Sequence, residues 1–162
     1  MTDEELMSAV KKGDLAKASL LFDRYNKHLY NFFVKITYNR ELGQDLTQNV
    51  FLRVIRFRHT YREEAKFKSW IFQIARNEYA DHYRSNKILK SDYDEVEMIS
   101  QKIEDIDEEL ANNEKEKLLY LALYRLNEEQ REILILSKFQ KLKYEDIAQI
   151  FDTTVGSVKV KV

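Results

Sequence analysis

The chain has 162 residues, of which 34% are charged, and its formal net charge is −1. This length allows one ordinary domain or two small ones and excludes a large multidomain enzyme. Cysteine is absent, which excludes disulfides, thiolate nucleophiles and cysteine-ligated metal sites and fits a reducing, cytoplasmic location. No apolar run follows Met1 and no stretch of about 18 uncharged apolar residues occurs, so the sequence predicts neither a signal peptide nor a membrane span.

The residues that usually interrupt helices are scarce. Proline is absent, and the only glycines are Gly13, Gly43 and Gly156. Helices are therefore expected to dominate the fold. Loops that bind nucleotide phosphates need several glycines within a few residues, whereas these three glycines lie far apart. The sequence thus disfavours a nucleotide-hydrolysing enzyme.

Charge is distributed unevenly along the chain. The first 84 residues carry 15 Lys and Arg against 11 Asp and Glu, the next 32 carry 4 against 11, and the last 46 carry 8 against 6. The acidic middle has weak helical periodicity, which is typical of a solvated linker. We therefore predict an all-α protein with two small helical domains, residues 1–86 and 114–162, joined by an acidic linker, residues 87–113.

The first domain is predicted to be a small group of helices. Thr2 opens a capping box for a short first helix, and Asp14 is the predicted cap of the second. Apolar residues at intervals of three and four extend the second helix to about Tyr38. The third and fourth helices are predicted at residues 40–58 and 66–84, with the short segment 59–65 between them.

The second domain is predicted to end in a helix-turn-helix. On its first helix, an apolar stripe is formed by Leu118, Leu119, Leu121, Ala122 and Leu126. Asn127 then caps a second helix, and two short helices follow at residues 144–151 and 155–162. A short helix, a tight turn with a capping threonine and another short helix are the ingredients of this DNA-binding motif.

The polar face of the fourth helix is a candidate nucleic-acid surface. At about 100° per residue, one strip gathers Lys66, Ser69, Gln73, Arg76, Asn77, Ala80 and Arg84, with Trp70 at its border. Basic side chains neutralise phosphates, and exposed rings can stack on unpaired bases. The rings interleaved with them belong to Tyr61, Phe72, Tyr79 and Tyr83. Composition equally allows an ordinary solvated helix face whose aromatic residues lie in the core.

Several segments match the conserved motifs of a known family. In the first domain they are Asp45-Leu-Thr-Gln-Asn-Val-Phe-Leu-Arg53 and Phe67-Lys-Ser-Trp-Ile-Phe-Gln-Ile-Ala-Arg-Asn77. In the second they are Leu126-Asn-Glu-Glu-Gln-Arg-Glu-Ile-Leu134, Tyr144-Glu-Asp-Ile-Ala148 and Val155-Gly-Ser-Val-Lys159. These motifs resemble those of the extracytoplasmic-function (ECF) sigma factors of the sigma-70 family. The resemblance implies a protein that binds core RNA polymerase, directs it to promoters and helps to open the duplex, with no catalysis and no cofactor of its own.

The resemblance assigns one face of the third helix to the polymerase. Asp45, Gln48, Asn49, Leu52 and Arg56 match the surface with which sigma factors dock on the clamp coiled coil of the β′ subunit. The outward Leu52 suits an interface anchor, although one exposed leucine on a solvated face needs no special explanation. The β subunit is the second expected polymerase contact.

The resemblance also assigns the minus-ten promoter element to the first domain. The segment 59–65 matches a loop that captures a flipped base of the non-template strand, here with His59, Tyr61 and Arg62. Extruding a base costs a few kcal/mol of stacking, which the pocket must return. On the fourth helix, the residues expected to contact promoter DNA are Lys66, Trp70, Gln73, Arg76, Asn77 and Arg84. For Trp70, burial in the core is an equally good interpretation.

The last helix is assigned to the minus-thirty-five element. Thr154 is expected to cap it, where amides and the helix dipole favour a phosphate, and the residues expected to face the major groove are Ser157, Lys159 and Lys161. Lys143 replaces the usual hydroxyl cap of the preceding helix. Family members continue for a turn or more past the position of Val162, so we expect the domain to be cut short and its contact with this element to be weak.

The sequence also allows interpretations other than a sigma factor, and each predicts a different binding behaviour. Glu78 and His82 share a helix face, but two ligands alone make a poor metal site, so no metal is predicted. The main rival is a stand-alone helix-turn-helix regulator, which would bind duplex DNA without polymerase, whereas a helical adaptor would bind neither DNA nor polymerase.

The resemblance further implies an anti-sigma factor as a partner. We also hypothesise that the acidic linker occupies the nucleic-acid channel of the polymerase, through Asp92, Asp94, Glu95 and Glu97.

Overall fold

The computed structural model describes residues 1–87 and 114–162, and every regular element in these two ranges is a helix. The predicted all-α fold is therefore confirmed. Apart from Lys87, which ends α4, the acidic linker lies outside the described residues, and so do the four residues of the channel hypothesis, Asp92, Asp94, Glu95 and Glu97.

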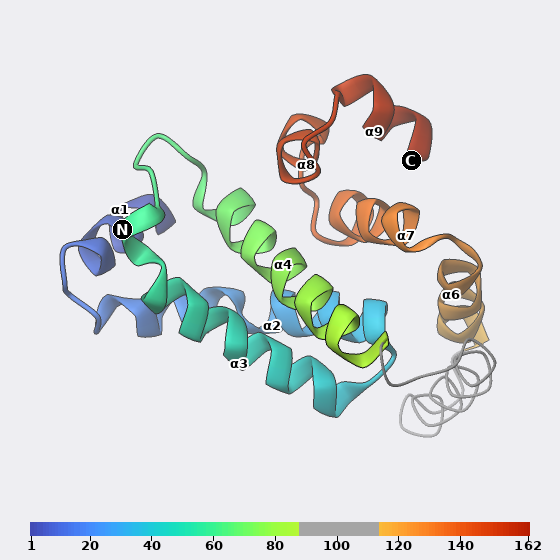
Figure 1. Cartoon of the computed structure of the whole chain (residues 1–162), viewed down its shortest axis with the longest axis horizontal. Coiled ribbons are helices and arrows are strands. Elements are labelled where there is room, and N and C mark those ends of the chain that lie inside the picture. Colours follow the sequence, from blue (N-terminus) through green and yellow to red (C-terminus); the bar gives the residue numbers. More distant parts are fainter. Residues whose placement is uncertain (88–113) are drawn as a thin grey trace.

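The first domain is built around three long helices (Figure 1). Its elements are α1 (Asp3–Lys11), α2 (Lys17–Thr37), α3 (Arg40–Arg56), the short 3₁₀ helix η1 (Arg58–Thr60) and α4 (Phe67–Lys87). Thr2 and Glu5 form the predicted capping box of α1. The Asn39 side chain accepts a hydrogen bond from the Leu42 amide at the start of α3. Both caps satisfy backbone amides that have no partner inside a helix.

The boundaries of α2 differ in part from the prediction. Asp14 does not cap this helix, because α2 begins at Lys17, its N-cap residue is Ala16, and no side chain closes that end. The Asp14 carbonyl instead accepts a backbone hydrogen bond from the Lys17 amide in a turn before the helix. At the other end α2 stops where predicted, since Tyr38 adopts a left-handed conformation with φ of 55°, which ends a helix.

The core of the first domain lies between α2, α3 and α4, with α1 packed against α2 and α4. The rings of Phe32 on α2 and Phe72 on α4 meet edge to face, with centroids 5.6 Å apart. The helices α2 and α3 approach closely at Gly43, where a Cβ atom would lie 2.9 Å from Val34 Cγ2. A larger residue at position 43 would therefore push these two helices apart.

The second domain contains the predicted helix-turn-helix. Its elements are α6 (Glu114–Arg125), α7 (Glu128–Leu134) with the π-helical extension η2 (Ile135–Phe139), α8 (Tyr144–Ile150) and α9 (Val155–Lys161). Asn127 caps α7 as predicted, and Thr154 caps α9 by accepting a hydrogen bond from the Ser157 amide. No side chain caps α8, because Lys143 stands at that position.

The apolar stripe predicted near α6 is confirmed at Leu119 and Leu126 but is wrong at Leu118 and Leu121. Leu118 is 65% exposed and Leu121 is 39% exposed, whereas Leu123 is buried. Leu119 and Leu126 lie four and three residues from Leu123, so they share its face of the helix, and both pack against the core. The packed face of α6 is therefore rotated relative to the predicted one.

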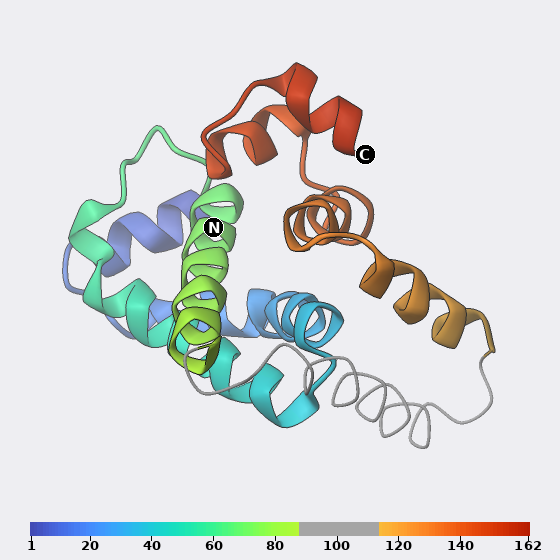
Figure 2. The ribbon, with the colours of Figure 1, turned by 45° about the vertical axis from the view of Figure 1, so that its right-hand side comes forward.

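The two domains pack directly on each other (Figures 1 and 2). α8 lies against α4, η2 lies against α2, and buried apolar residues of both domains form one connected cluster. The ring of Tyr38 meets those of Tyr120 and Tyr124 with centroids 5.5 and 6.0 Å apart. Periodicity within single helices did not predict the contact between the two domains. This contact determines which parts of α4 are exposed.

Candidate nucleic-acid interface

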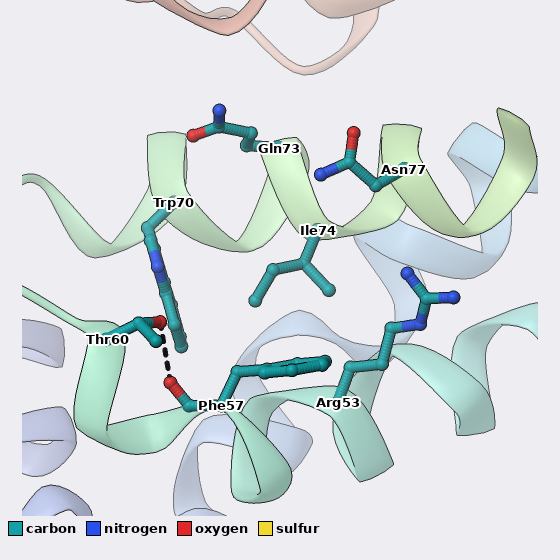
Figure 3. Close-up of a pocket in the computed structure, with 7 residues that line it drawn as sticks. All are labelled: Arg53, Phe57, Thr60, Trp70, Gln73, Ile74 and Asn77. Atoms are coloured by element: carbon teal, nitrogen blue, oxygen red, sulfur yellow. Dashed lines mark hydrogen bonds between the residues drawn. The ribbon is translucent and has the colours of Figure 1, made fainter. Parts of the chain in front are cut away.

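A groove lies between α4 and the end of α3 (Figure 3). Its volume is about 380 Å³, and the residues that line it are Arg53, Phe57, Thr60, Trp70, Gln73, Ile74 and Asn77. Trp70 and Ile74 project from α4 toward Phe57, while Gln73 and Asn77 lie on the far side of α4, at the rim. The structure thus brings together three residues that the sequence predicted to contact promoter DNA.

The groove combines apolar surface with hydrogen-bonding groups. Phe57 is 43% exposed, so its ring offers a stacking surface to a planar group. The side chains of Gln73 and Asn77 are exposed, and their amides can both donate and accept hydrogen bonds. The groove thus offers an exposed ring inside and two amides at its rim on α4, which are the kinds of group that bind an unstacked nucleobase and its neighbours on a strand.

Charged side chains hold the walls of the groove together. Arg53 on α3 pairs with Glu78 and Asp81 on α4, each at 2.7 Å. Asn49 donates a hydrogen bond to the second carboxylate oxygen of Glu78 at 3.0 Å. Since Glu78 is buried, these partners replace the water that its carboxylate has lost. The network fixes α3 against α4 and thereby sets the width of the groove.

Sequence reasoning did not assign Phe57 to the site. Its spacing from Val54 is that of a core residue, which predicts burial. However, α3 ends at Arg56, so Phe57 lies outside the helix and its ring turns to the groove. The other groove residues that the sequence did not assign to DNA are Arg53, Thr60 and Ile74.

Tyr61 does not lie on this surface. Its side chain is fully buried, its hydroxyl donates to the Ala65 carbonyl at 2.8 Å, and its ring meets Trp70 edge to face with centroids 5.1 Å apart. Burial raises the pKa of Tyr61 to about 12. In this structure the ring therefore cannot stack on a base, contrary to the expectation, because it anchors the segment after η1 to the core.

Other aromatic residues of the predicted basic segment are either buried in the core or partly exposed at the groove. Phe72 and Tyr79 are buried, in agreement with the alternative that such rings serve the core. Trp70 is half-buried, so part of its ring is packed and part borders the groove. His59 and Arg62 are exposed on the segment between α3 and α4.

The predicted polymerase-docking residues form one exposed face of α3. All five side chains are exposed: Asp45, Gln48, Asn49, Leu52 and Arg56. Leu52 is 60% exposed, although it stands next to the buried Phe51. The Arg56 guanidinium lies 5.5 Å from the centre of the Phe57 ring. The docking face and the groove therefore adjoin at the end of α3.

The other edge of α4 faces the second domain. Arg76 Nε pairs with Glu132 of α7 at 3.0 Å, and its guanidinium lies 4.2 Å from the centre of the Phe151 ring. Lys66 Nζ is 3.5 Å from a carboxylate oxygen of Asp146 on α8. Arg84 borders the cleft between α4 and α7. The DNA-contacting residues predicted on α4 thus divide between an open groove and a covered edge.

The carboxyl group of Glu132 is removed from water at this covered edge. Its residue is only 4% exposed. Burial raises the pKa of Glu132 to about 7, and the opposing attraction of Arg76 offsets only part of that effect. Burial also raises the pKa of Tyr79, and the nearby Glu128 carboxylate adds to that effect. These groups make the contact between α4 and α7 a packed polar interface.

The residues predicted for the minus-thirty-five element lie on and next to α9. Thr154 and Lys159 are exposed, and Ser157 is partly exposed. Lys161 Nζ pairs with Glu129 on α7 at 3.0 Å. Because α9 has seven residues, it makes about two turns and presents a small surface to DNA.

Glu78 and His82 do not come together as a metal site. Glu78 is engaged by Arg53 and Asn49, and within residues 1–87 and 114–162 no three His, Cys, Asp or Glu side chains are placed to hold a metal ion. None of the helices described in these two ranges has the length and apolarity that a membrane span needs.

Two family models match the chain, one in each helical domain. The model for Sigma-70 region 2 matches residues 21–88, and the model for Sigma-70, region 4 matches residues 116–162. The chain belongs to the sigma-70 family. This sigma factor is of the ECF type: it directs RNA polymerase to promoters and performs no catalysis itself. The groove and the predicted docking face lie in region 2, and the helix-turn-helix lies in region 4.

Relatives of this sigma factor match it over nearly its full length. The RNA polymerase sigma-H factor of Pseudomonas aeruginosa is 25% identical over 99% of this chain and 88% of the relative. The ECF RNA polymerase sigma-E factor of Haemophilus influenzae is 25% identical over 100% of this chain and 90% of the relative. With both sigma regions present in order, a stand-alone helix-turn-helix regulator is not favoured.

Two solved structures share the fold. CnrH, in complex with the cytosolic domain of CnrY, is 16% identical, covers 99% of this chain and 89% of its own, and superimposes with a TM-score of 0.73. The sigma factor RpoE from Bartonella quintana, in complex with the anti-sigma factor NepR, is 20% identical, with coverage of 89% and 88% and a TM-score of 0.67.

Proposed function

We propose that this sigma factor binds the polymerase with the exposed face of α3 and the non-template strand of the minus-ten element with the adjoining groove. The observation that carries the proposal is the junction of the two surfaces at the end of α3, where Arg56 lies against Phe57. Docking through α3 therefore presents the groove to DNA in a fixed position relative to the polymerase.

Leu52 is the proposed anchor of the docking face. It is 60% exposed, and the polar side chains around it include Asp45, Gln48 and Arg56. An apolar centre within a polar rim is the usual composition of an energetic hot spot in a protein interface. The proposed partner of this face is the coiled coil of the β′ clamp, and the β subunit is the proposed second polymerase contact.

The groove is the proposed site of an extruded base. Phe57 supplies an exposed ring for stacking, and Gln73 and Asn77 supply amides for hydrogen bonds to the edge of the base. Trp70 is packed against Tyr61, so the wall it forms is rigid before DNA arrives. A preformed wall loses little side-chain entropy on binding, which helps to repay the few kcal/mol needed to extrude a base.

Polar and basic side chains on both edges of α4 and on the segment before it are proposed to contact the phosphates and bases of the melted strand. His59 and Arg62 are exposed on the segment before α4, whereas Lys66, Arg76 and Arg84 lie on the edge of α4 that faces region 4. Such contacts position DNA with little regard to sequence and weaken as salt rises. Tyr61 is not part of the proposed surface, because it is buried.

Region 4 is proposed to contact duplex DNA at the minus-thirty-five element through Thr154, Ser157, Lys159 and Lys161. The support is their position on the second helix of a helix-turn-helix, the element that enters the major groove in this motif. Since α9 makes only about two turns, its contribution to affinity is expected to be smaller than that of the groove.

An anti-sigma factor completes the proposed set of partners. Its support is that the structures of CnrH and of RpoE were solved with CnrY and with an anti-sigma factor, respectively. The proposed site of action is the cytoplasm, where promoter DNA and polymerase are found.

Substitution of Leu52 by aspartate tests the docking face. We expect Leu52→Asp to weaken binding to core polymerase by about 30-fold or more, as for a typical hot spot, while the helical content of the chain stays unchanged. The matched control is Leu20→Asp on α2, since Leu20 is also exposed and lies outside the docking face. Equal binding of core polymerase by the wild type and Leu52→Asp would overturn the assignment.

A further inference from the structure

Three exposed lysines gather on the segment that leads into α8. Lys138 belongs to η2, and Lys141 and Lys143 belong to the turn between η2 and α8. Residues 133–144 contain no aspartate or glutamate. Within the part of the chain that the structure describes, the three side chains make neither a hydrogen bond nor an ion pair. The charge of Lys141 reaches Lys68 on α4, whose pKa is lowered first by burial and then by this repulsion.

Lys141 holds a backbone conformation that lysine rarely adopts. Its φ is 57°, in the left-handed region, which strains a residue with a Cβ atom and favours glycine. Tyr38 has a similar φ of 55°, but its ring packs against those of Tyr120 and Tyr124. The Lys141 side chain is exposed and makes no such contact. Strain that the fold itself does not use is a reason to look for a function.

Lys143 also stands where another residue would stabilise the fold. It is the N-cap residue of α8, and no side chain caps this helix. Serine, threonine, aspartate or asparagine at this position would accept a hydrogen bond from a free backbone amide. Both lysines of the turn thus occupy positions that the fold alone would give to other residues.

The turn holds its two lysines in a defined place. Gln140 and Leu142, which alternate with them, are only 4% and 6% exposed. The Gln140 amide donates to the Ile135 carbonyl at 3.1 Å, and the Leu142 amide donates to the Leu136 carbonyl at 3.0 Å. These anchors fix the backbone of the turn, so the exposed lysines project from a rigid base.

The place of the turn in the helix-turn-helix indicates which partner its lysines fit. In this motif the second helix enters the major groove and the first helix crosses the phosphate backbone. The turn leads directly into α8, the first of the two helices, and is therefore expected to lie beside the backbone when α9 is in the groove. On α9, Lys161 is already paired with Glu129, so that helix supplies little free positive charge for phosphates.

We propose that Lys141 and Lys143 form a phosphate-binding site of region 4, which holds the backbone of the minus-thirty-five duplex while α9 enters the major groove. This inference rests on the proposed contact of region 4 with that element and adds a second surface to it. Lysine contacts to phosphates carry little sequence information, so the site strengthens binding without changing the preferred sequence. It thereby offsets the small surface of the seven-residue α9.

Removal of the two lysines should stabilise the chain and weaken its DNA binding at the same time. Lys141→Gly relieves the left-handed strain and Lys143→Ser supplies the missing cap, so the unfolding temperature of the double variant should rise. We expect the affinity of its holoenzyme for a duplex promoter to fall about tenfold, and the slope of log affinity against log salt to become shallower by about two. Weaker binding by a more stable protein excludes unfolding as the cause.

Two controls separate the charge of the lysines from their position. Lys12→Gln with Lys27→Gln removes the same charge from exposed positions of region 2 and should leave both the affinity and the salt slope unchanged. Lys143→Arg keeps the cation and still lacks a cap, so it should bind the promoter as the wild type does. All variants should bind core polymerase equally well.

The outcomes separate this inference from the proposed function. Lys159→Ala, measured in parallel, reports the contact of α9 itself. If Lys159→Ala weakens promoter binding and the double variant does not, the phosphate site is disproved and the contact of region 4 with the minus-thirty-five element stands. If neither weakens binding, that contact fails and the phosphate site fails with it.

Two further results would overturn the proposal. A lower unfolding temperature of the double variant would show that the lysines serve the fold. Weaker binding of the double variant to core polymerase would show that their partner is a protein rather than DNA.

Discussion

The two edges of α4 carry residues of the same predicted role in opposite environments. On one edge, Gln73 and Asn77 are exposed at an open groove. On the other, Arg76 is paired with a buried glutamate of region 4. A single helix therefore has one edge that borders an open groove and one that is covered by region 4. The difference shows that the position of a residue on a helix does not establish whether its side chain is exposed to a binding partner.

A second contrast separates residues that support the groove from residues that line it. Tyr61 and Trp70 are in contact, yet only Trp70 borders the groove. The buried ring supports the wall, and the half-buried ring forms it. Substitutions at the two positions should therefore affect different measurements.

The largest expected effect comes from Tyr61→Ala. Removing a fully buried aromatic side chain leaves a cavity, so the free energy of unfolding should fall by about 3–5 kcal/mol in chemical denaturation. Tyr61→Phe, which keeps the ring and loses the hydrogen bond to Ala65, should cost only about 1 kcal/mol. If Tyr61→Ala lost DNA binding at unchanged stability, Tyr61 would belong to the DNA surface.

The double substitution Gln73→Ala with Asn77→Ala should weaken DNA binding without affecting the fold. We expect the affinity of the holoenzyme for a single-stranded minus-ten oligonucleotide to fall about tenfold, which corresponds to roughly 1.4 kcal/mol, and the free energy of unfolding to stay within about 0.5 kcal/mol. Gln44→Ala, at another exposed glutamine of the same domain, serves as the control. Undiminished binding by the double variant would remove the groove from the DNA surface.

A pH-dependent effect on stability is expected from Glu132. The charged groups that face it are Arg76 and Arg84 on α4 and Glu128 and Glu129 on α7. Burial raises the pKa of Glu132 to about 7, so its contribution to stability is full below its ordinary pKa of 4.5 and is lost as pH rises through about 7.

The wild type should therefore lose stability relative to Glu132→Gln between pH 5 and pH 8, because the glutamine stays neutral throughout. Denaturant titrations of both proteins across this range give the difference. A difference that stays constant with pH would mean that Glu132 titrates as an ordinary exposed carboxyl group.

The smallest expected effect concerns the two helices of the helix-turn-helix. Thr154 caps α9, whereas Lys143 leaves α8 without a side-chain cap. Lys143→Ser should raise the free energy of unfolding by about 0.5–1 kcal/mol, and Thr154→Ala should lower it by a similar amount. Thermal unfolding of the two variants compares the helix starts directly. A loss of stability in Lys143→Ser would show that the lysine makes a stronger contact than a cap.

Local features of the fold were predictable because they depend on neighbouring residues. The capping box at Thr2, the end of α2 at Tyr38 and the caps at Asn127 and Thr154 follow from side chains within a few positions of each helix end. The helix start assigned to Asp14 failed because a backbone turn satisfies the same amides. The stripe predicted near α6 failed at Leu118 and Leu121, because packing against the rest of the molecule, rather than leucine content, selects the buried face of the helix.

The candidate site was predictable only in part for the same physical reason. Gln73, Asn77 and Leu52 are exposed where helical spacing placed them. The burial of Tyr61 and the pairing of Arg76 with Glu132 depend on contacts between segments far apart in the sequence. The groove residue Phe57 depends on the point at which α3 ends. None of these three features has a signature within one helix.

Photo-crosslinking from Gln73 tests the central claim most directly. A photoreactive amino acid at this position, in holoenzyme bound to a promoter, should crosslink to the non-template strand within the minus-ten element, and only after the duplex has opened. Crosslinking to closed duplex alone, or no crosslink to DNA from a holoenzyme that transcribes normally, would contradict the assignment of the groove to an unstacked base.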